Sequence, residues 1–214
     1  MCQSVDNRNQ IVLIGYSGHA LVAAEVLMQL GYTIYGYMDK SKLLNNPLSI
    51  PYLGFEGNEE DLKKLKGTPV FPSIGDNAIR RKVFELLASN NFEQPNAISP
   101  KANISSFCSI GIGTLVCQGA CINPFAKIGK AVIINTGAII EHECSIGDYS
   151  HIAPGAVLAG NVAVGKNSFV GANAVIKQGI TIGENVVVGA GAVVLKNIPD
   201  NSVYAGNPAK SIKL

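Results

Sequence analysis

The strongest constraint in this sequence is an aliphatic residue at every sixth position through its second half. From Ile104 to Val194, sixteen consecutive sixth positions hold isoleucine, leucine or valine. The residue four places after each is usually small, as at Cys108, Ala120 and Ser150. A period of six is a multiple of the two-residue period of a strand and fits no α-helical period. The pattern therefore predicts short strands separated by turns and excludes helix.

Glycine adds a second period of eighteen residues to the same region. It follows the aliphatic residue at Gly111, Gly129, Gly147, Gly165 and Gly183. Three hexapeptides thus make one coil of a triangular prism, in which aliphatic side chains stack at about 4.8 Å spacing over roughly 25 Å. One repeat cannot bury its own apolar face, so stacking supplies the core. The pattern resembles the hexapeptide repeat of the left-handed parallel β-helix, and the handedness comes from that resemblance.

The first hundred residues show a different organisation, typical of a Rossmann-like α/β domain. A buried strand is predicted over 10–14, a glycine loop over 15–19 and a helix over 20–30. A second strand over 33–38 ends at Asp39, which completes a strand–helix–strand unit. The sequence therefore predicts one half of a dinucleotide-binding fold.

A further strand and helix complete this domain. The strand is predicted over 69–74, and the turn 75–77 caps a helix over 78–89. The composition changes to the hexapeptide register at Pro100. We therefore predict a Rossmann-like domain over 1–100 and a left-handed β-helix domain over 101–214.

The glycine loop indicates what the first domain binds. Only Gly15 and Gly18 of a G-x-G-x-x-G fingerprint are present, so a redox dinucleotide is disfavoured. A glycine-rich turn at a helix N-terminus still binds phosphate through backbone N–H groups. A nucleotide diphosphate attached to a substrate fits this loop, and a tight turn without a ligand is the alternative.

Composition excludes several other classes of protein. The chain is 47% hydrophobic and 15% charged, with a formal net charge of +2 and no basic cluster, so no nucleic-acid partner is expected. It has no run of eighteen apolar residues, and its polar N-terminus lacks the apolar core of a signal peptide. We therefore predict a cytoplasmic protein without a membrane partner. Five cysteines without C-x-x-C spacing predict reduced thiols.

The chain has only three histidines, which narrows the search for a catalytic base. His142 lies between Glu141 and Glu143, two residues after an inward-pointing Ile140. A carboxylate bonded to one imidazole nitrogen fixes the tautomer and strengthens the other nitrogen as a base. This cluster predicts a general base on the surface of the prism, and a solvated polar patch is the alternative.

Two other chemistries fit the coil less well. A shared metal, as in the γ-class carbonic anhydrases, needs three histidines, and only His142 and His151 lie in the coils. We therefore predict no metal. Cys144 is close to His142, but it occupies the small inward position of its hexapeptide, which disfavours a nucleophilic role.

Several motifs together resemble a known family. They are Gly15-Tyr-Ser-Gly-His-Ala-Leu-Val22, Tyr37-Met-Asp-Lys40, Ser73-Ile-Gly-Asp-Asn-Ala-Ile-Arg80, Ile134-Asn-Thr-Gly-Ala-Ile-Ile-Glu-His-Glu-Cys144 and Val203-Tyr-Ala-Gly-Asn-Pro-Ala-Lys210. They resemble the sugar acyltransferases of the sialic acid O-acetyltransferase type, and within that family most of all the UDP-N-acetylbacillosamine N-acetyltransferases. The resemblance covers nearly the whole chain and both domains in order.

The resemblance implies an acetyl-CoA-dependent homotrimer with acetyl-CoA between the coils of adjacent subunits. It assigns His142 as the general base and Glu143 as the residue that increases its basicity. It places His151 and the backbone at Ala172 and Ala190 against acetyl-CoA. Asn135 falls in the Asn-Thr step that precedes the catalytic histidine.

The same resemblance assigns the sugar-nucleotide site to the first domain. The residues are Ser17, Gly18, His19, Asp39, Lys40, Gly75 and, from the coil, Asn135. The expected reaction is N-acetylation of the 4-amino group of a nucleotide-linked 4-amino-4,6-dideoxy sugar, UDP-linked in the first instance, in bacterial glycan biosynthesis. O-Acetylation of sialic acid or a related nonulosonic acid is the alternative, and a non-catalytic trimeric scaffold or sugar-nucleotide sensor is the second.

Overall fold

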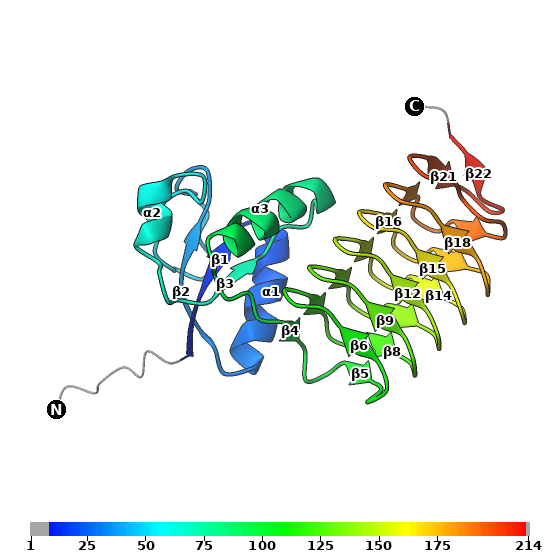
Figure 1. The fold of residues 1–214 in the computed structure, drawn as a ribbon, viewed down its shortest axis with the longest axis horizontal. Helices are drawn as coiled ribbons and strands as arrows, with labels where there is room; N and C mark the ends of the chain where they lie inside the picture. The colour runs from blue at the N-terminus through cyan, green and yellow to red at the C-terminus, as the bar shows by residue number, and fades with distance from the viewer. Residues whose placement is uncertain (1–8, 213–214) are drawn as a thin grey trace.

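A computed structural model describes residues 9–212 of the chain as two domains joined end to end (Figure 1). A small α/β domain comes first, and a long prism of coils follows it. Cys2 and the first residues of the polar N-terminus lie outside the described residues, as does most of the segment on which the signal-peptide prediction depends. Among residues 9–212, no helix has the length and apolar character needed to cross a membrane.

The α/β domain is built on a three-stranded parallel sheet in the order β2-β1-β3. Its strands are β1 Gln10–Ile14, β2 Thr33–Met38 and β3 Val70–Pro72. The central strand β1 is buried from Ile11 to Ile14, as its continuous apolar run predicts. Because the chain leaves β1 and crosses to either side of it, a crevice forms outside the carboxyl ends of the strands. The glycine loop, Asp39 and Gly75 all follow those ends.

Three helices accompany this sheet: α1 Gly18–Gln29, α2 Glu59–Lys63 and α3 Asn77–Ser89. Helix α3 begins where the turn predicts, because an Asp76 carboxylate oxygen accepts from the Ile79 backbone N–H at 2.8 Å. The short helix α2 is absent from our sequence prediction. Its signal is local: Asn58 accepts from the Glu60 N–H at 2.9 Å, and acidic residues fill the first turn.

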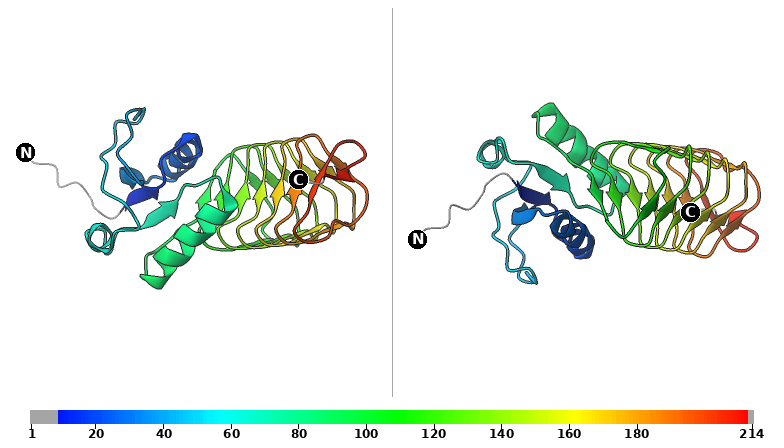
Figure 2. Two further views of the ribbon diagram at one scale, coloured as in Figure 1. Left: turned by 90° about the horizontal axis from the view of Figure 1, so that it is seen from above. Right: turned by 90° about the horizontal axis from the view of Figure 1, so that it is seen from below.

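The two domains share a hydrophobic core. Helix α1 and strand β1 pack against the coil through Leu115, Cys117 and Ile133, which are fully buried. In Figure 1, α1 lies beside the first coil strand, β4 Ala97–Ile98. Both views in Figure 2 show α3 beside the start of the prism. The domains therefore form one continuous packed unit around the first coils.

The coil is a stack of short strands, each of two residues except the three-residue β21. Its strands are β4 Ala97–Ile98, β5 Asn103–Ile104, β6 Ser109–Ile110, β7 Leu115–Val116, β8 Cys121–Ile122, β9 Lys127–Ile128, β10 Ile133–Ile134, β11 Ile139–Ile140, β12 Ser145–Ile146, β13 His151–Ile152, β14 Val157–Leu158, β15 Ala163–Val164, β16 Phe169–Val170, β17 Val175–Ile176, β18 Thr181–Ile182, β19 Val187–Val188, β20 Val193–Val194, β21 Val203–Ala205 and β22 Lys210–Ser211. Each of the sixteen predicted aliphatic positions is the second residue of a strand.

These strands form the three faces of the prism, as sheets of eight, six and five strands that are parallel except for β22. Partners are eighteen residues apart, as in the pairing of Ile134 with Ile152 and of Ile140 with Leu158. The aliphatic side chains of successive coils form the central core. The predicted fold class, a Rossmann-like domain followed by a left-handed β-helix of hexapeptide repeats, is confirmed.

Small residues sit at the corners because the coils leave little room there. The hydroxyls of Thr114, Ser150 and Ser168 are buried at one corner. Each donates to a glycine carbonyl fifteen residues ahead, at 2.8–3.0 Å, and accepts an N–H from the next coil. The eighteen-residue glycine series has the same cause: a Cβ on Gly165 would lie 2.5 Å from the Gly183 carbonyl carbon.

The coil extends beyond the hexapeptide register at both ends. Strand β4 pairs with β7 and so joins the eight-stranded face before residue 100. The first coil strand thus lies before the predicted boundary, and the division into domains at residue 100 remains a prediction. At the other end, Val188 pairs with Tyr204, sixteen rather than eighteen residues away. The last turn is two residues shorter, which explains why the register stops at Val194, and β22 then folds back antiparallel on β21.

Candidate active site

The predicted site residues fall on two different corners of the prism. We call the turns 105–108, 123–126, 141–144, 159–162, 177–180 and 195–198, which follow strands of the six-stranded face, the histidine corner. We call the turns 117–120, 135–138, 153–156, 171–174 and 189–192, which follow strands of the eight-stranded face, the alanine corner.

His142 projects from the histidine corner with Glu143 as its partner. The imidazole Nδ1 lies 3.1 Å from Glu143 Oε2, and both side chains are more than half exposed. Glu143 adopts a left-handed backbone conformation, with φ of 62°, at the tip of the turn. Because a carboxylate oxygen only accepts, Nδ1 carries the proton, and Nε2 is free to act as a base. The pair can therefore take a proton from a ligand on the surface.

Gly160 lies one coil further along the same corner and forms a floor under the His142 ring. A Cβ on Gly160 would lie 2.5 Å from both Cε1 and Nε2 of His142. The backbone joins the two turns as well, since the Asn161 N–H donates to the His142 carbonyl at 2.8 Å. Sequence reasoning missed Gly160, because it lies outside the eighteen-residue glycine series.

Asn135, Ala172 and Ala190 lie on the alanine corner. Ala172 and Ala190 are eighteen residues apart and therefore neighbours on successive coils. The backbone there is tightly stacked: the Gly191 N–H donates to the Ala172 carbonyl at 2.8 Å, and a Cβ on Gly171 would meet the Ala190 nitrogen at 2.5 Å. The Ala190 side chain is exposed. A slender ligand could thus approach the backbone of this corner.

His151 begins strand β13 on the eight-stranded face and is buried against the α/β domain. Its Nδ1 lies 3.4 Å from the Gly75 carbonyl, and its Nε2 lies 3.1 Å from the Asn135 amide nitrogen. Burial, with the nearby Arg80 cation and His19, lowers the pKa of His151 to about 3. His151 is therefore neutral at physiological pH and fixed by hydrogen bonds at both nitrogens.

His19 comes to the same place from the α/β domain. Its ring centroid lies 6.0 Å from that of His151, and its Cβ would be 3.7 Å from a Cβ on Gly75. Burial and the Arg80 charge lower the pKa of His19 to about 4. Three predicted site residues, His19, Gly75 and His151, are thus brought together where the domains meet.

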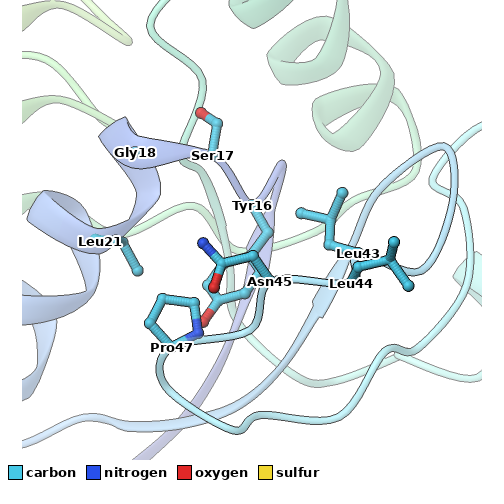
Figure 3. A pocket seen from close by; sticks show the side chains of 8 residues that line it. All are labelled: Tyr16, Ser17, Gly18, Leu21, Leu43, Leu44, Asn45 and Pro47. Carbon is cyan, nitrogen blue, oxygen red and sulfur yellow. The ribbon is translucent and has the colours of Figure 1, made fainter.

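Ser17 and Gly18 line a pocket of about 260 Å³ at the start of α1. In Figure 3, Leu21 of α1 lies on one side of this pocket, Leu43 and Leu44 lie on the other, and Asn45 and Pro47 stand between them. Ser17 is the N-cap residue of α1, and its side chain makes no capping hydrogen bond. A helix start without an acidic residue in its first turn suits a phosphate.

Asp39 supports this pocket from the end of β2. One carboxylate oxygen accepts from the Tyr16 backbone N–H at 3.0 Å, and the other accepts from the Lys40 N–H at 2.7 Å. The Tyr16 hydroxyl in turn donates to the Asn46 side chain at 3.0 Å. Asp39 therefore fixes the glycine loop, while Lys40 is exposed at the mouth of the crevice.

Sequence reasoning missed the far wall of this pocket. Tyr16, Leu43, Leu44, Asn45 and Pro47 line it, and four of them come from a loop without regular structure. The dipeptide Asn46-Pro47 indicates a loop. Periodicity does not predict that this loop returns to the start of α1, so only the Tyr16–Asn46 and Tyr16–Leu48 hydrogen bonds reveal the wall.

Gly75 lines a second hollow, of about 430 Å³, between the start of α3 and the coil. Asn77 closes its base by donating to the Ser168 carbonyl at 3.1 Å. His142 and Glu143 lie on the histidine corner, away from Gly75 and the hollow. Within one subunit, the candidate base is therefore separate from the candidate binding residues.

Within residues 9–212, no cluster of three or more histidine, cysteine, aspartate or glutamate side chains has the arrangement of a metal site.

An α/β domain with a crevice at the carboxyl edge of its sheet, followed by a hexapeptide coil with an exposed His–Glu pair, defines a class of two-domain acyltransferase. Family models agree with this class along the chain. The PglD N-terminal domain matches residues 10–87, the bacterial transferase hexapeptide matches residues 125–160, and the hexapeptide repeat of succinyl-transferase matches residues 161–196.

Solved structures are similar over nearly the whole chain. The acetyltransferase domain of PglB from Neisseria gonorrhoeae, in complex with acetyl-CoA, is 34% identical, with a TM-score of 0.89 over 95% of this chain and 99% of that one. PerB from Caulobacter crescentus, in complex with CoA and GDP-perosamine, is 37% identical, with a TM-score of 0.90 over 95% and 97%. WeeI from Acinetobacter baumannii is 27% identical, with a TM-score of 0.85 over 94% and 99%.

A protein of Acanthamoeba polyphaga mimivirus is also similar, at 33% identity over 108 residues. This alignment covers 50% of the chain and only 21% of the viral protein. The chain belongs to the sugar acyltransferases that join a PglD N-terminal domain to hexapeptide repeats, as the motifs predict. The predicted enzyme class, acyltransferase, and the predicted acetyl donor, acetyl-CoA, are confirmed by these relatives.

Proposed function

We propose that this protein transfers the acetyl group of acetyl-CoA to the 4-amino group of a nucleotide-linked 4-amino-4,6-dideoxy sugar, UDP-linked in the first instance, in bacterial glycan biosynthesis. One observation carries the proposal. An exposed His142–Glu143 pair and a phosphate-suited pocket at the start of α1 occur together in one chain. PerB of C. crescentus, which shares this fold over nearly its whole length, binds GDP-perosamine, an amino sugar on a nucleoside diphosphate.

In the proposed reaction, His142 acts as the general base. The amine nitrogen attacks the thioester carbonyl, and Nε2 of His142 takes the proton that the nitrogen loses. The C–N bond forms, the C–S bond then breaks, and the departing CoA thiolate takes the proton held by His142, which restores the neutral base and releases CoA thiol. Glu143 holds Nδ1–H and stabilises the imidazolium that forms. A variant of the C. crescentus enzyme in which one histidine is replaced by asparagine binds both CoA and GDP-perosamine.

Direct attack needs no covalent enzyme intermediate, and the structure offers little support for one at Cys144. The Cys144 thiol is fully buried and lies 3.3 Å from the Ala159 carbonyl. Burial raises the pKa of this thiol above its ordinary value, so the thiolate is scarce at neutral pH. Cys144 therefore fills a corner of the prism.

We propose that the binding residues and the base of one active site come from two subunits of a homotrimer. Within one subunit, His142 lies on the histidine corner, whereas Asn135, Ala172 and Ala190 lie on the alanine corner. The six-stranded face connects these corners and carries an outward apolar row of Cys121, Ile139, Val157, Val175 and Val193. Val175 in this row is 42% exposed. Covering the row with neighbouring coils would bury apolar surface and bring opposite corners together.

The two alternatives make different demands on the site. O-Acetylation of sialic acid needs the same base but no nucleoside diphosphate, so the pocket at Ser17 and Gly18 would have no ligand. A non-catalytic scaffold or sugar-nucleotide sensor does not need the His142–Glu143 pair on the surface. The pocket and the pair together favour N-acetylation of a nucleotide sugar.

A thiol-release assay with acetyl-CoA tests the proposal. The acceptors are a UDP-linked 4-amino-4,6-dideoxy sugar, its GDP-linked counterpart and free sialic acid. We expect CoA release with a nucleotide amino sugar and a product that gains one acetyl group on nitrogen by mass spectrometry. Release only with sialic acid would move the assignment to O-acetylation, and release with none of the three would contradict the proposed acceptor class.

Oligomeric state and location are tested separately. Light scattering on the purified protein should give the mass of three chains, and Val175→Glu, which places a charge in the apolar row, should shift the mass toward one chain. A single-chain mass for the unaltered protein would contradict the shared site. The predicted cytoplasmic location remains part of the proposal, and cell fractionation checks it.

A further inference from the structure

Arg80 is a buried cation that the proposed reaction does not use. It lies in the first turn of α3, and only 1% of its surface is exposed. An arginine is seldom buried without an ion pair. No carboxylate in the described residues forms a salt bridge with Arg80. The charge of the cap residue Asp76 only partly offsets the fall in the Arg80 pKa that burial causes.

Neutral oxygens from both domains take the place of a carboxylate. Toward the α/β domain, the guanidinium donates to the Ile74 and Gly75 carbonyls, both at 3.0 Å, and to the Asn77 side-chain oxygen at 2.8 Å. Toward the coil, it donates to the Ala131 carbonyl at 2.9 Å and to the Tyr149 carbonyl at 2.7 Å. One planar group therefore holds two coil turns and the end of β3 in a fixed relation.

The Gly75 carbonyl continues this connection to the coil. It accepts from Arg80 and lies 3.4 Å from Nδ1 of His151. Because a carbonyl only accepts, Nδ1 of His151 carries the proton, and Nε2 of the neutral ring accepts from the Asn135 amide at 3.1 Å. The Asn135 oxygen accepts from the Thr136 N–H at 2.8 Å, which fixes the direction of the amide.

A continuous chain of hydrogen bonds thus runs from Arg80 through Gly75, His151 and Asn135 to the alanine corner. Gly75 belongs to the predicted sugar-nucleotide site, and Asn135 begins the corner that carries Ala172 and Ala190. Each of these contacts sets the position or the tautomer of the next group. A shift of the guanidinium would therefore displace both the Gly75 carbonyl and the Asn135 side chain.

We propose that Arg80 is a positioning residue: it sets the acceptor pocket in register with the alanine corner by holding the Gly75 carbonyl and, through it, the tautomer of His151. The proposal rests on the proposed function, because it assigns the acceptor to Gly75 and the donor to the alanine corner. The guanidinium donors of Arg80 are all bonded to protein oxygens, so the proposal gives Arg80 no direct contact with either substrate. The charged and titratable groups that face its guanidinium are Asp76, His19 and His151.

The decisive variant is Arg80→Lys, which keeps the charge and removes the planar fork. An ammonium has three donors and cannot reproduce the separate bonds to the β3 end and the coil turns. Arg81→Lys is the matched control. Arg81 is the next residue of the same helix, is exposed, and forms an ion pair with Glu85 at 3.0 Å.

The first measurement needs no substrate. With ¹⁵N-labelled histidine, the three histidines of the chain give three rings, each assigned by removing one histidine at a time. We expect a protonated Nδ1 and a bare Nε2 for His151 in the unaltered protein and in Arg80→Lys a mixture of tautomers. The same single tautomer in Arg80→Lys would overturn the proposal, and so would a mixture of tautomers in the unaltered protein.

The second measurement separates positioning from stability. In Arg80→Lys we expect the KM for the nucleotide sugar to rise, or kcat to fall, between about 10- and 100-fold after correction for the folded fraction. Arg81→Lys should leave both constants unchanged. A lower melting temperature with unchanged constants would assign Arg80 to stability alone. If Arg80→Lys does not fold, Asn77→Ala, which removes one guanidinium partner, should change the His151 tautomer in the same direction, and an unchanged tautomer would refute the proposal.

The two measurements also separate the two proposals. Failure of the proposed function would leave the His151 tautomer and its dependence on Arg80 intact, since no acceptor is present in that experiment. Failure of the Arg80 proposal would leave acetyl transfer intact and would remove only the role of Arg80 in aligning the acceptor pocket with the alanine corner.

Discussion

The histidines of this protein occupy two contrasting environments. His142 stands on a coil corner, more than half exposed, with its Nδ1 on a glutamate carboxylate. His19 and His151 lie between the two domains, where burial and Arg80 lower their pKa values to about 4 and about 3. Both of these rings therefore stay neutral, and His151 is held by hydrogen bonds to the Gly75 carbonyl and the Asn135 amide. Only the exposed ring has both a free nitrogen and a partner for the charge that it gains.

The largest expected effect comes from removing the exposed ring. His142→Ala should lower kcat by roughly 10²–10⁴-fold, the usual loss for a general base. Circular dichroism and light scattering should be unchanged, because the side chain is exposed and contributes little to the core. Thiol release with a nucleotide amino sugar measures the effect. Unaltered turnover would remove His142 from the mechanism.

Gly160→Ala should come next, with a loss on the order of 10²-fold in kcat. The added Cβ would lie 2.5 Å from Cε1 and Nε2 of His142, so the ring must move away from its present position. Displacing a catalytic group by about 1 Å can cost this much. Steady-state kinetics with both substrates measures it.

The control for Gly160→Ala is the same change without the ring. In the His142→Ala background, Gly160→Ala should cause no further loss, since nothing remains to be displaced. An additional loss of similar size in that background would show that Gly160 acts through something other than His142.

A smaller effect is expected from the partner of His142. Glu143→Gln keeps the shape of the side chain and removes the charge that stabilises the imidazolium, and we expect kcat to fall about tenfold. Glu141→Gln is the matched control, because the structure bonds Nδ1 to the carboxylate of Glu143. Equal losses in the two variants would contradict the assignment of Glu143.

The smallest effect concerns stability and pH. His19 and His151 have folded-state pKa values below the ordinary value of 6.5, so the unfolded chain binds more protons between these values. The stability is fully present above pH 6.5 and is lost as the pH falls toward the folded-state values. Each histidine then lowers the free energy of unfolding by up to about 1.4 kcal/mol per pH unit.

Urea unfolding at about pH 7.5 and at about pH 5 measures this slope. His151→Asn removes one of the two titrations and should flatten the pH dependence of the free energy of unfolding. An unchanged slope would mean that His151 is already accessible to protons in the folded protein.

The coil could be predicted almost completely from the sequence. Each aliphatic position from Ile104 to Val194 is fixed by one local rule, that an inward side chain must stack on its neighbour a coil away. The ends could not be predicted in this way. Strand β4 carries Ala97 outward against α1, and the last turn is two residues shorter, so neither end repeats the pattern.

The candidate site divides along similar lines. His142 and Glu143 could be found because the segment 140–143 alone places an imidazole beside carboxylates after an inward residue. The pocket wall at Asn45 and Pro47, the floor at Gly160 and the cation at Arg80 depend on contacts between distant segments. A glycine under a ring and an arginine on neutral carbonyls leave no local signature, so the structure is needed to find them.

The central claim is that the base of one subunit works with the alanine corner of another, and mixing of subunits tests it most directly. His142→Ala and Ala190→Trp, which fills the exposed position on the alanine corner, should each be nearly inactive alone. Co-expressed in equal amounts, they should assemble at random, so that about a quarter of all sites in the trimer population combine an intact His142 with an intact Ala190. We predict recovery of about that fraction of the unaltered activity. Mixed trimers with no activity beyond that of the separate variants would contradict a site shared between subunits.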